Sequence, residues 1–224
     1  MRRRRSGRNM SKIRGEVARP SYREKIITEG MRVVHERGFA GSSVRDIVKA
    51  AGVPQGSFTN HFQSKETFAL EVLNAYYERG REFTKSTLLN DSESPVRRLK
   101  AWVDGMLKSY NQNGQWNGCM LGNLGAEHSE GTDLIQQRVC ELFVEIEHNL
   151  TYCLKAAVKA GEFPGSINCK DWAIFIHTSL EGAVLGAKAT RSHNPMKIFR
   201  NILFSQLDAM KSSNGRESQA SKRA

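Results

Sequence analysis

Apolar residues recur at the spacing of helix faces along most of the chain, and the alternation expected of strands is hard to find. The most informative stretch, residues 43–62, predicts two short helices joined by a tight turn. Ser43 or the serine before it can cap the first helix, and Gly52 can end it. Pro54 suits the first turn of the second helix, which is expected to offer polar side chains around buried phenylalanines. The first helix has one apolar face, formed by Val44, Ile47, Val48 and Ala51.

The same spacing predicts further helices on both sides of this pair. One helix precedes it, from a cap at Ser21 to Gly38, and a long helix capped by Ser64 follows it. A polar turn at residues 88–95 then separates this part from the rest of the chain. Beyond the turn, helices are expected over residues 96–110, 132–160, 170–190 and 195–210. The pattern predicts an all-α protein.

Its expected organisation is an N-terminal three-helix bundle joined by a long helix to a C-terminal helical domain. The helix over residues 170–190 carries small residues on one side, which would let a neighbouring helix approach closely. These small residues are Gly182, Ala183, Gly186 and Ala187. A paired surface is therefore expected there.

Length and composition exclude several classes of protein. At 224 residues the chain is long enough to bury a substantial core in one or two domains. No apolar run reaches the length of a membrane span, and the N-terminus lacks the apolar part of a signal peptide. The four cysteines show no metal-ligand spacing with the six histidines. We therefore expect a cytoplasmic protein with no membrane association, no structural metal and no cofactor.

The net charge of +11 lies mostly at the two ends of the chain. Residues 1–19 contribute +7 and residues 211–224 contribute +3. Of the remainder, residues 20–65 carry +3 and residues 66–210 carry −2. Only one end of the folded part is basic, which favours a phosphate-facing end and a body that does not bind DNA. The two tails are expected to be disordered, the first being either an arm that follows DNA or a plain extension that begins only at Met10.

Three segments in succession resemble the N-terminal DNA-binding domain of the TetR family of bacterial repressors. They are GFAGSSVRDI, AAGVPQGSF and HFQSKETF, and the resemblance covers about residues 20–80. It implies a helix-turn-helix DNA-binding domain over 20–80, with its motif at 43–62, and a ligand-sensing and dimerisation domain over 81–210. It also implies a repressor that binds a palindromic operator on double-stranded DNA as a homodimer held by the last two helices, and that a small-molecule inducer releases.

The same resemblance implies which side chains meet DNA. Gln55 would bond an adenine edge, Ser57 or Thr59 would meet a thymine methyl or a base acceptor, and Arg45 would reach a guanine or a phosphate. Contacts to the DNA backbone are expected from Tyr22, Ser43, His61 and Lys65, and Asn60 lies on the same exposed helix. Thr59 departs from the family, which usually has tyrosine there. Each of these residues is otherwise an ordinary solvated side chain.

Two further segments, GCMLGNLGAE at 118–127 and EGAVLGAK at 181–188, resemble the branch of this family that includes the repressors of N-ethylmaleimide reductase and of acrylate utilisation. In that branch the matching cysteine senses electrophiles, which makes Cys119 the candidate sensor. A helix beginning near Asn117 would stabilise its thiolate, and Lys188 would add to this effect if the fold brings it near. The alternative is a buried cysteine that serves only as a small hydrophobe.

The C-terminal domain also offers a set of large side chains that can line an apolar cavity for the inducer, although such a set is more often plain core. This set is Trp102, Met106, Tyr110, Trp116, Phe143 and Trp172.

Two other functions remain open at this stage. A nonspecific DNA-binding protein would owe its affinity to the basic tails and would bind random duplexes as well as an operator. A small helical enzyme would use Cys119 as its nucleophile, but the chain contains no Walker loop, zincin helix or nucleophile elbow. We therefore expect that the protein is not an enzyme.

Overall fold

The computed structural model describes residues 19–110, 116–127 and 133–221. Within these ranges, side chains are described as far as Lys211. These ranges contain helices and no strand, and none of their helices is long and apolar enough to cross a membrane. The helices are α1 Tyr22–Arg37, α2 Val44–Ala51, α3 Ser57–His61, α4 Lys65–Ser86, α5 Pro95–Ser109, α6 Met120–Ala126, α7 Asp133–Lys159, α8 Cys169–Thr190 and α9 Asn194–Ser221. The predicted N-terminal arm lies almost wholly outside the described residues.

The N-terminal helices begin and end where local side chains dictate. Ser21 and Ser43 each accept a hydrogen bond from the backbone three residues on, and the acidic residues there, Glu24 and Asp46, bond back to complete a capping box. Ser64 caps α4 in the same way without the return bond. These three helix starts are confirmed by the structure.

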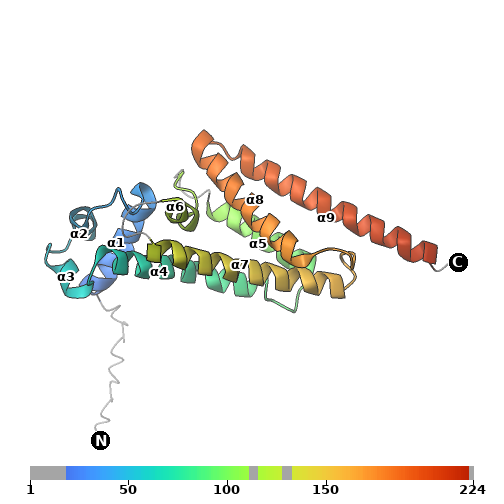
Figure 1. The fold of residues 1–224 in the computed structure, drawn as a ribbon, viewed down its shortest axis with the longest axis horizontal. Helices are drawn as coiled ribbons and strands as arrows, with labels where there is room; N and C mark the ends of the chain where they lie inside the picture. The colour runs from blue at the N-terminus through green and yellow to red at the C-terminus, as the bar shows by residue number, and fades with distance from the viewer. Residues whose placement is uncertain (1–18, 111–115, 128–132, 222–224) are drawn as a thin grey trace, which may run out of the picture.

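Helices α1 to α3 and the first turns of α4 form a compact unit, which we call the reader (Figure 1). Its core contains Ile47, Phe58, Phe62 and Phe68, all nearly inaccessible to solvent. Gly30 on α1 lets these side chains approach, because a Cβ there would lie 2.4 Å from Phe68 Cζ. The reader is thus held to the rest of the chain by α4, whose first part belongs to the reader's own core.

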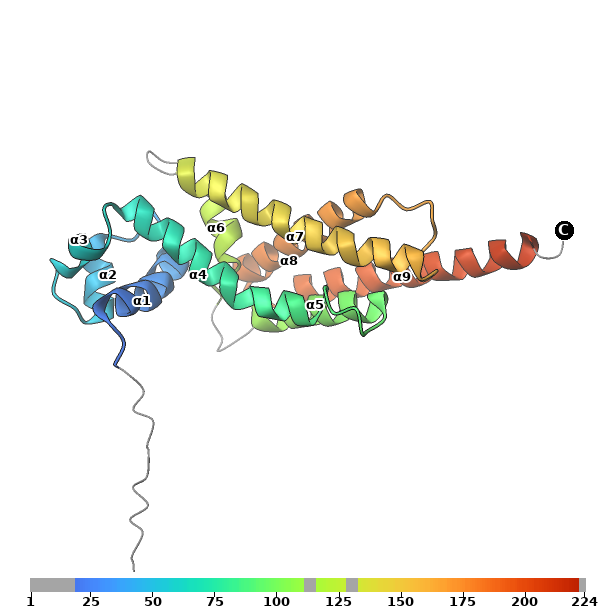
Figure 2. The same ribbon diagram turned by 90° about the horizontal axis from the view of Figure 1, so that it is seen from below.

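The remainder, which we call the body, is an elongated bundle. Helix α4 runs from the reader along the body beside α7, and α5 lies against both (Figure 2). Helices α8 and α9 pack against each other and cover the bundle on one side, with α8 in contact with α7 (Figure 1). The short helix α6 lies between the reader and the body and packs on α7 and α4.

Two helix boundaries differ from those predicted. Helix α9 continues to Ser221 instead of ending at Met210. No proline interrupts that segment, and adding residues to an existing helix costs little, so the loss of apolar spacing does not end the helix. Pro54 precedes α3 instead of opening it, because its carbonyl accepts the Ser57 N–H at 2.9 Å in a preceding turn.

Candidate DNA-binding surface and ligand cavity

The reader presents most of its predicted DNA contacts to solvent. Exposed side chains on α2, on α3 and in the turn between them are those of Arg45, Gln55, Thr59, Asn60 and His61. Ser57 is an exception, since it is only 7 % exposed at the start of α3. The structure therefore does not give Ser57 the exposed side chain that a base contact requires, and that prediction is corrected. Ser57 is the first residue of α3 and, with Phe58, is one of its two buried residues.

The remaining predicted contacts have partners within the protein. Thr59 donates its hydroxyl to the Gly56 carbonyl at 3.1 Å, which fixes its side chain along α3. Ser43 is exposed, but its hydroxyl is used in the cap of α2. The Lys65 ammonium lies 4.1 Å from the centre of the Phe39 ring, and burial there lowers its pKa. Tyr22 is half-exposed at the start of α1. Lys65 and Tyr22 therefore lie at the edges of the surface formed by α2 and α3.

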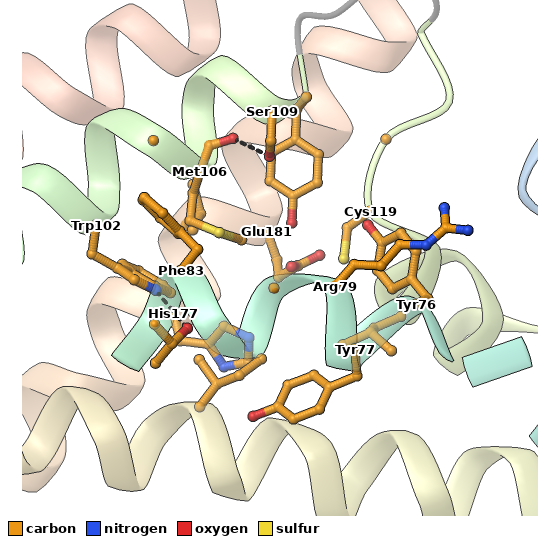
Figure 3. Close-up of a pocket in the computed structure, with 18 of the residues that line it drawn as sticks. Tyr76, Tyr77, Arg79, Phe83, Trp102, Met106, Ser109, Cys119, His177 and Glu181 are labelled. Atoms are coloured by element: carbon orange, nitrogen blue, oxygen red, sulfur yellow. Dashed lines mark hydrogen bonds between the residues drawn. The ribbon is translucent and has the colours of Figure 1, made fainter. Parts of the chain in front are cut away.

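The body contains a cavity of about 730 Å³, a size usual for a small-molecule site. Its wall is contributed by α4, α5 and α8 and by the segment that leads into α6 (Figure 3). Large rings dominate the wall, and polar groups converge on one part of it. The lining includes Tyr76, Tyr77, Arg79, Phe83, Trp102, Met106, Tyr110, Cys119, His177 and Glu181.

Half of the side chains predicted to surround a cavity do so. Trp102, Met106 and Tyr110 line it, whereas Trp116, Phe143 and Trp172 do not. Trp116 stacks on His193 with ring centres 4.5 Å apart. The rings of Phe143 and His177 form a T-shaped pair with their centres 4.6 Å apart, and Trp172 packs on Phe175. The prediction is wrong for these three. For Phe143 and Trp172 the reason is that an apolar helix face contacts neighbouring helices as well as a cavity, and spacing does not distinguish the two, whereas Trp116 lies outside the helices.

Cys119 is buried, with 5 % of its surface exposed, and it precedes α6 as the N-cap instead of lying in the first turn. Burial raises the pKa of its thiol to about 12, and the charge of Glu181 acts in the same direction. Hydrogen bonds from the Gly122 N–H and the Tyr110 hydroxyl favour the thiolate but do not outweigh these effects. The expectation of a stabilised thiolate is therefore wrong for this conformation, since desolvation exceeds the contribution of a short helix.

Glu181 was not predicted as a site residue, although it opens one of the two segments that carry the resemblance. Its carboxylate lies beside the Cys119 sulfur in the cavity wall (Figure 3). The glycine at position 122 makes room for it, because a Cβ there would lie 2.5 Å from Glu181 Oε2. Burial raises the pKa of Glu181, while its hydrogen bond with Cys119 lowers it. The two groups thus form a thiol and carboxylate pair.

Lys188 lies near Cys119 but does not pair with it. Its ammonium donates to Asn123 Oδ1 at 2.8 Å, and the Asn123 amide in turn donates to the Asn117 carbonyl at 2.8 Å. Lys188 and Cys119 both line a second cleft of about 690 Å³ between α1, α6 and α8. Lys188 therefore holds the segment before α6 in place in this conformation.

Two residues that sequence reasoning missed join this segment to the reader. The Glu127 carboxylate, at the end of α6, accepts the Phe39 N–H at 2.8 Å and the Ala40 N–H at 2.9 Å. His35, near the end of α1, bonds the Gly118 carbonyl through Nε2 at 2.8 Å. A carbonyl only accepts, so Nε2 carries the proton. The segment that contains Cys119 is thus bonded to the reader at both of its ends.

A surface-exposed helix-turn-helix, joined to a helical body that encloses a cavity, defines a DNA-binding regulator. Among the described residues there is no cluster of side chains suited to a metal ion. Residues 26–72 match the family described as bacterial regulatory proteins, tetR family, and residues 95–203 match the tetracyclin repressor-like C-terminal domain. The chain belongs to the TetR family of transcriptional regulators, as the similarity of a full-length relative also shows.

That relative is the HTH-type transcriptional repressor DhaR of Mycobacterium sp. (strain GP1), 32% identical over 191 residues, or 85% of this chain and 94% of DhaR. The HTH-type transcriptional repressor NemR of Escherichia coli (strain K12) is 33% identical over 106 residues, 47% of this chain and 53% of NemR. The crystal structure of E. coli NemR in its reduced form matches with a TM-score of 0.73 at 25% identity, covering 81% of this chain and 95% of that one. The regulatory protein TetR from Rhodobacter sphaeroides matches with a TM-score of 0.74 at 26% identity, covering 80% and 94%.

Proposed function

We propose that the protein is a homodimeric repressor that binds a palindromic operator and leaves it when the body receives an inducer. One α3 helix reaches only a few base pairs, which is too little to select a site in a genome. Two readers related by a twofold axis would meet major grooves about 34 to 36 Å apart, or a larger helical spacing. DhaR and NemR carry the name repressor, which supports repression over activation.

Helices α8 and α9 provide the surface for the second copy. Large apolar side chains are exposed on these two helices, an arrangement that a twofold pairing with the same surface would bury. They are Ile174, Phe175, Leu185, Ile198 and Ile202. A Cβ added at Gly182 would meet no atom within 4 Å, so α8 also offers space for close approach of a partner helix.

The observation that carries the regulatory part is the pair of links from the Cys119 segment to the reader. Glu127 is bonded to the turn between α1 and α2, and Gly118 is bonded to His35 on α1. A displacement of Cys119 or of α6 therefore acts on the helices that set the angle of α3. An inducer shifts the population toward a non-binding arrangement if it binds that arrangement better.

We propose an electrophile as one inducer, with Cys119 as its target. The Cys119 sulfur would form a bond to the β-carbon of an activated alkene, and the double-bond electrons would move toward the carbonyl. Glu181 would take the thiol proton as the bond forms and return it to the α-carbon, so that the adduct keeps every atom of both reactants. A base beside the thiol is needed, because the raised pKa keeps the thiol protonated near neutral pH.

The test is a mobility-shift titration on the operator, found by genomic footprinting, against a random duplex at near-physiological salt. We expect preference for the operator and release by N-ethylmaleimide in stoichiometric amounts. Cys119→Ser should keep operator binding and lose that release. Equal affinity for random DNA would indicate a nonspecific DNA-binding protein, and catalytic consumption of the electrophile would indicate a cysteine-dependent enzyme.

A further inference from the structure

The polar groups of the cavity can be sorted into those already satisfied and those still free to meet a ligand. The hydroxyls of Tyr76 and Tyr110 are bonded to Cys119, and Trp102 donates its Nε1–H to Thr84 Oγ1 at 3.3 Å. His35 is used by the Gly118 carbonyl. These four donors of the wall are therefore occupied.

Two acceptors of the wall keep the capacity to bind a ligand, because one has no partner and the other is bonded only to the Cys119 thiol. His177 is 2 % exposed, lines the cavity, and has no hydrogen-bond partner at Nε2. Its Nδ1 lies 3.3 Å from a Glu147 carboxylate oxygen, which can only accept, so the proton of a neutral imidazole sits on Nδ1. Nε2 is then a bare acceptor, and a buried acceptor without a partner is costly.

The second acceptor is Glu181, which lines the same wall. No lysine or arginine within the described part of the chain forms an ion pair with it. The one arginine in the lining, Arg79, is exposed at the mouth. Behind the wall lie further carboxylates, Glu147 at His177 and Glu145 at the Tyr77 hydroxyl. Glu145 is paired with Arg81 at 3.0 Å, so the carboxylate of the lining that no described lysine or arginine pairs with is that of Glu181.

Flat apolar surface surrounds these two acceptors. The rings of Phe83, Trp102 and Tyr76 stand around the space that Glu181 and His177 face (Figure 3). Tyr110 also lines the cavity. Aromatic faces attract cations, and more strongly when water is excluded. An anion would instead be repelled by the buried carboxylate of Glu181.

We infer that this cavity selects an aromatic organic cation with N–H donors, such as an amidinium or guanidinium, whose head lies between Glu181 and His177. The ligand would donate one N–H to the carboxylate and one to His177 Nε2, and its ring would lie among the aromatic side chains. This inference names the ligand class of the body proposed above to receive an inducer, and it does not depend on reaction at Cys119.

The test uses the full-length protein without DNA and four probes that share a phenyl ring: benzamidine, benzyltrimethylammonium, benzamide and benzoate. Calorimetric titration should rank benzamidine first, with benzamide at least about ten-fold weaker and benzoate not bound, which is the effect of one hydrogen bond to a charged group. Benzyltrimethylammonium, a cation without N–H donors, should bind more weakly than benzamidine and more tightly than benzoate. Benzoate binding as well as benzamidine, or no binding of benzamidine at millimolar concentration, overturns the inference.

Glu181→Gln keeps the shape of the side chain and removes its charge. It should weaken benzamidine about ten-fold or more and leave benzamide within about three-fold. Glu141→Gln, on the surface of α7 in a pair with Arg138, is the matched control and should change neither. An unchanged affinity of Glu181→Gln for benzamidine contradicts the inference. Should that variant not fold, the pH dependence of the wild type decides: benzamidine affinity falls on acidification as Glu181 is protonated, and a flat profile is the contrary result.

Operator release is measured separately. If benzamidine binds without releasing the operator, the ligand class stands and the regulatory proposal fails for this ligand. If the operator is bound and released by N-ethylmaleimide but benzamidine does not bind, the inference about the cavity fails alone.

Discussion

Glu127 accepts the Phe39 N–H at 2.8 Å, which joins the end of α6 directly to the turn that leads into the helix-turn-helix. The same carboxylate also accepts the Ala40 N–H, so one side chain satisfies two successive backbone donors of the reader. Gly38 lies beneath it, since a Cβ there would lie 2.3 Å from Glu127 Oε1. With the His35–Gly118 bond, this contact is one of the links between the segment that contains Cys119 and the reader.

Glu127→Gln should weaken the contact between α6 and the turn before α2. The amide accepts only through its oxygen, so one of the two N–H groups loses its partner, and a hydrogen bond to a charged group becomes a neutral one. We expect the free energy of unfolding to fall by about 1 kcal/mol, and inducer to change operator affinity less than in the wild type. Urea denaturation and mobility-shift titration with and without inducer measure the two effects.

Glu141→Gln again provides the control, because its partner Arg138 is on the same exposed helix face. It should change stability by less than about 0.5 kcal/mol and leave the response to inducer intact. A Glu127→Gln variant with undiminished response would show that the signal reaches the reader elsewhere.

The high pKa of Cys119 predicts how stability depends on pH. The thiol keeps its proton up to about 12 in the folded protein, whereas in the unfolded chain it ionises near the ordinary value of 9.0. Between these values the folded state binds more protons, so the free energy of unfolding falls as pH rises, by about 1.4 kcal/mol per unit at most for this group.

Cys119→Ser does not titrate in that range, so it should remove this contribution and lose less stability than the wild type from pH 9 upward. Cys153 contributes a similar slope in both proteins, since burial raises its pKa to about 11, and it cancels in the comparison. Denaturation at a series of pH values measures the difference. Parallel curves for the two proteins would contradict the burial of an uncharged thiol.

Gly122→Ala should separate Glu181 from Cys119. The new methyl would lie 2.5 Å from Glu181 Oε2, so the carboxylate has to move away from the sulfur. Alkylation of Cys119 near neutral pH should slow about ten-fold or more if Glu181 accepts the thiol proton. Mass spectrometry of Cys119 after timed exposure to N-ethylmaleimide measures this rate. Gly165→Ala, in the turn before α8, where an added Cβ meets nothing within 4 Å, is the control and should react at the wild-type rate.

The parts of this structure that follow from sequence are those decided by neighbouring residues. Ser21, Ser43 and Ser64 start helices because a cap needs only a hydroxyl and the backbone two or three residues on, so the reader could be predicted nearly helix by helix. The end of α9 could not be predicted in this way, because its polar residues are compatible with either a helix or a coil.

The cavity was less predictable, because its chemistry depends on residues brought together from different helices. Trp172 fits the same apolar helix pattern as Trp102, yet only Trp102 lines the cavity. Glu181 and His177 are one helical turn apart on α8, but that spacing alone indicates a solvated polar face as readily as two acceptors inside a cavity. Their role depends on packing against α4, α5 and the segment before α6.

The dimer surface can be tested with two matched charge substitutions. Leu185 on α8 is 62 % exposed and Leu134 on α7 is 59 % exposed. Leu185→Glu places a charge in the proposed interface and should shift the protein toward monomer in sedimentation velocity, weakening operator binding about ten-fold or more. Leu134→Glu should remain dimeric and bind the operator as the wild type does. Loss of the dimer in both variants, or in neither, would show that α8 is not the interface.

Two side chains of the reader are expected to affect DNA binding in different ways. Gln55 is exposed beside α3, and if it bonds a base edge, Gln55→Ala should cost about 1–3 kcal/mol on the operator and little on random DNA. Lys65 lies beside the Phe39 ring, and Lys65→Ala should weaken binding to both duplexes equally. It should also lower the number of counterions released on binding, read from the slope of log K against log salt, by about one. Titrations of both duplexes at several salt concentrations distinguish the two. If Gln55→Ala loses affinity for the operator and for random DNA in parallel, Gln55 contacts the DNA backbone and not a base. Arg45 and Asn60 would then be the exposed side chains that read bases, because the hydroxyl of Thr59 is already bonded within α3.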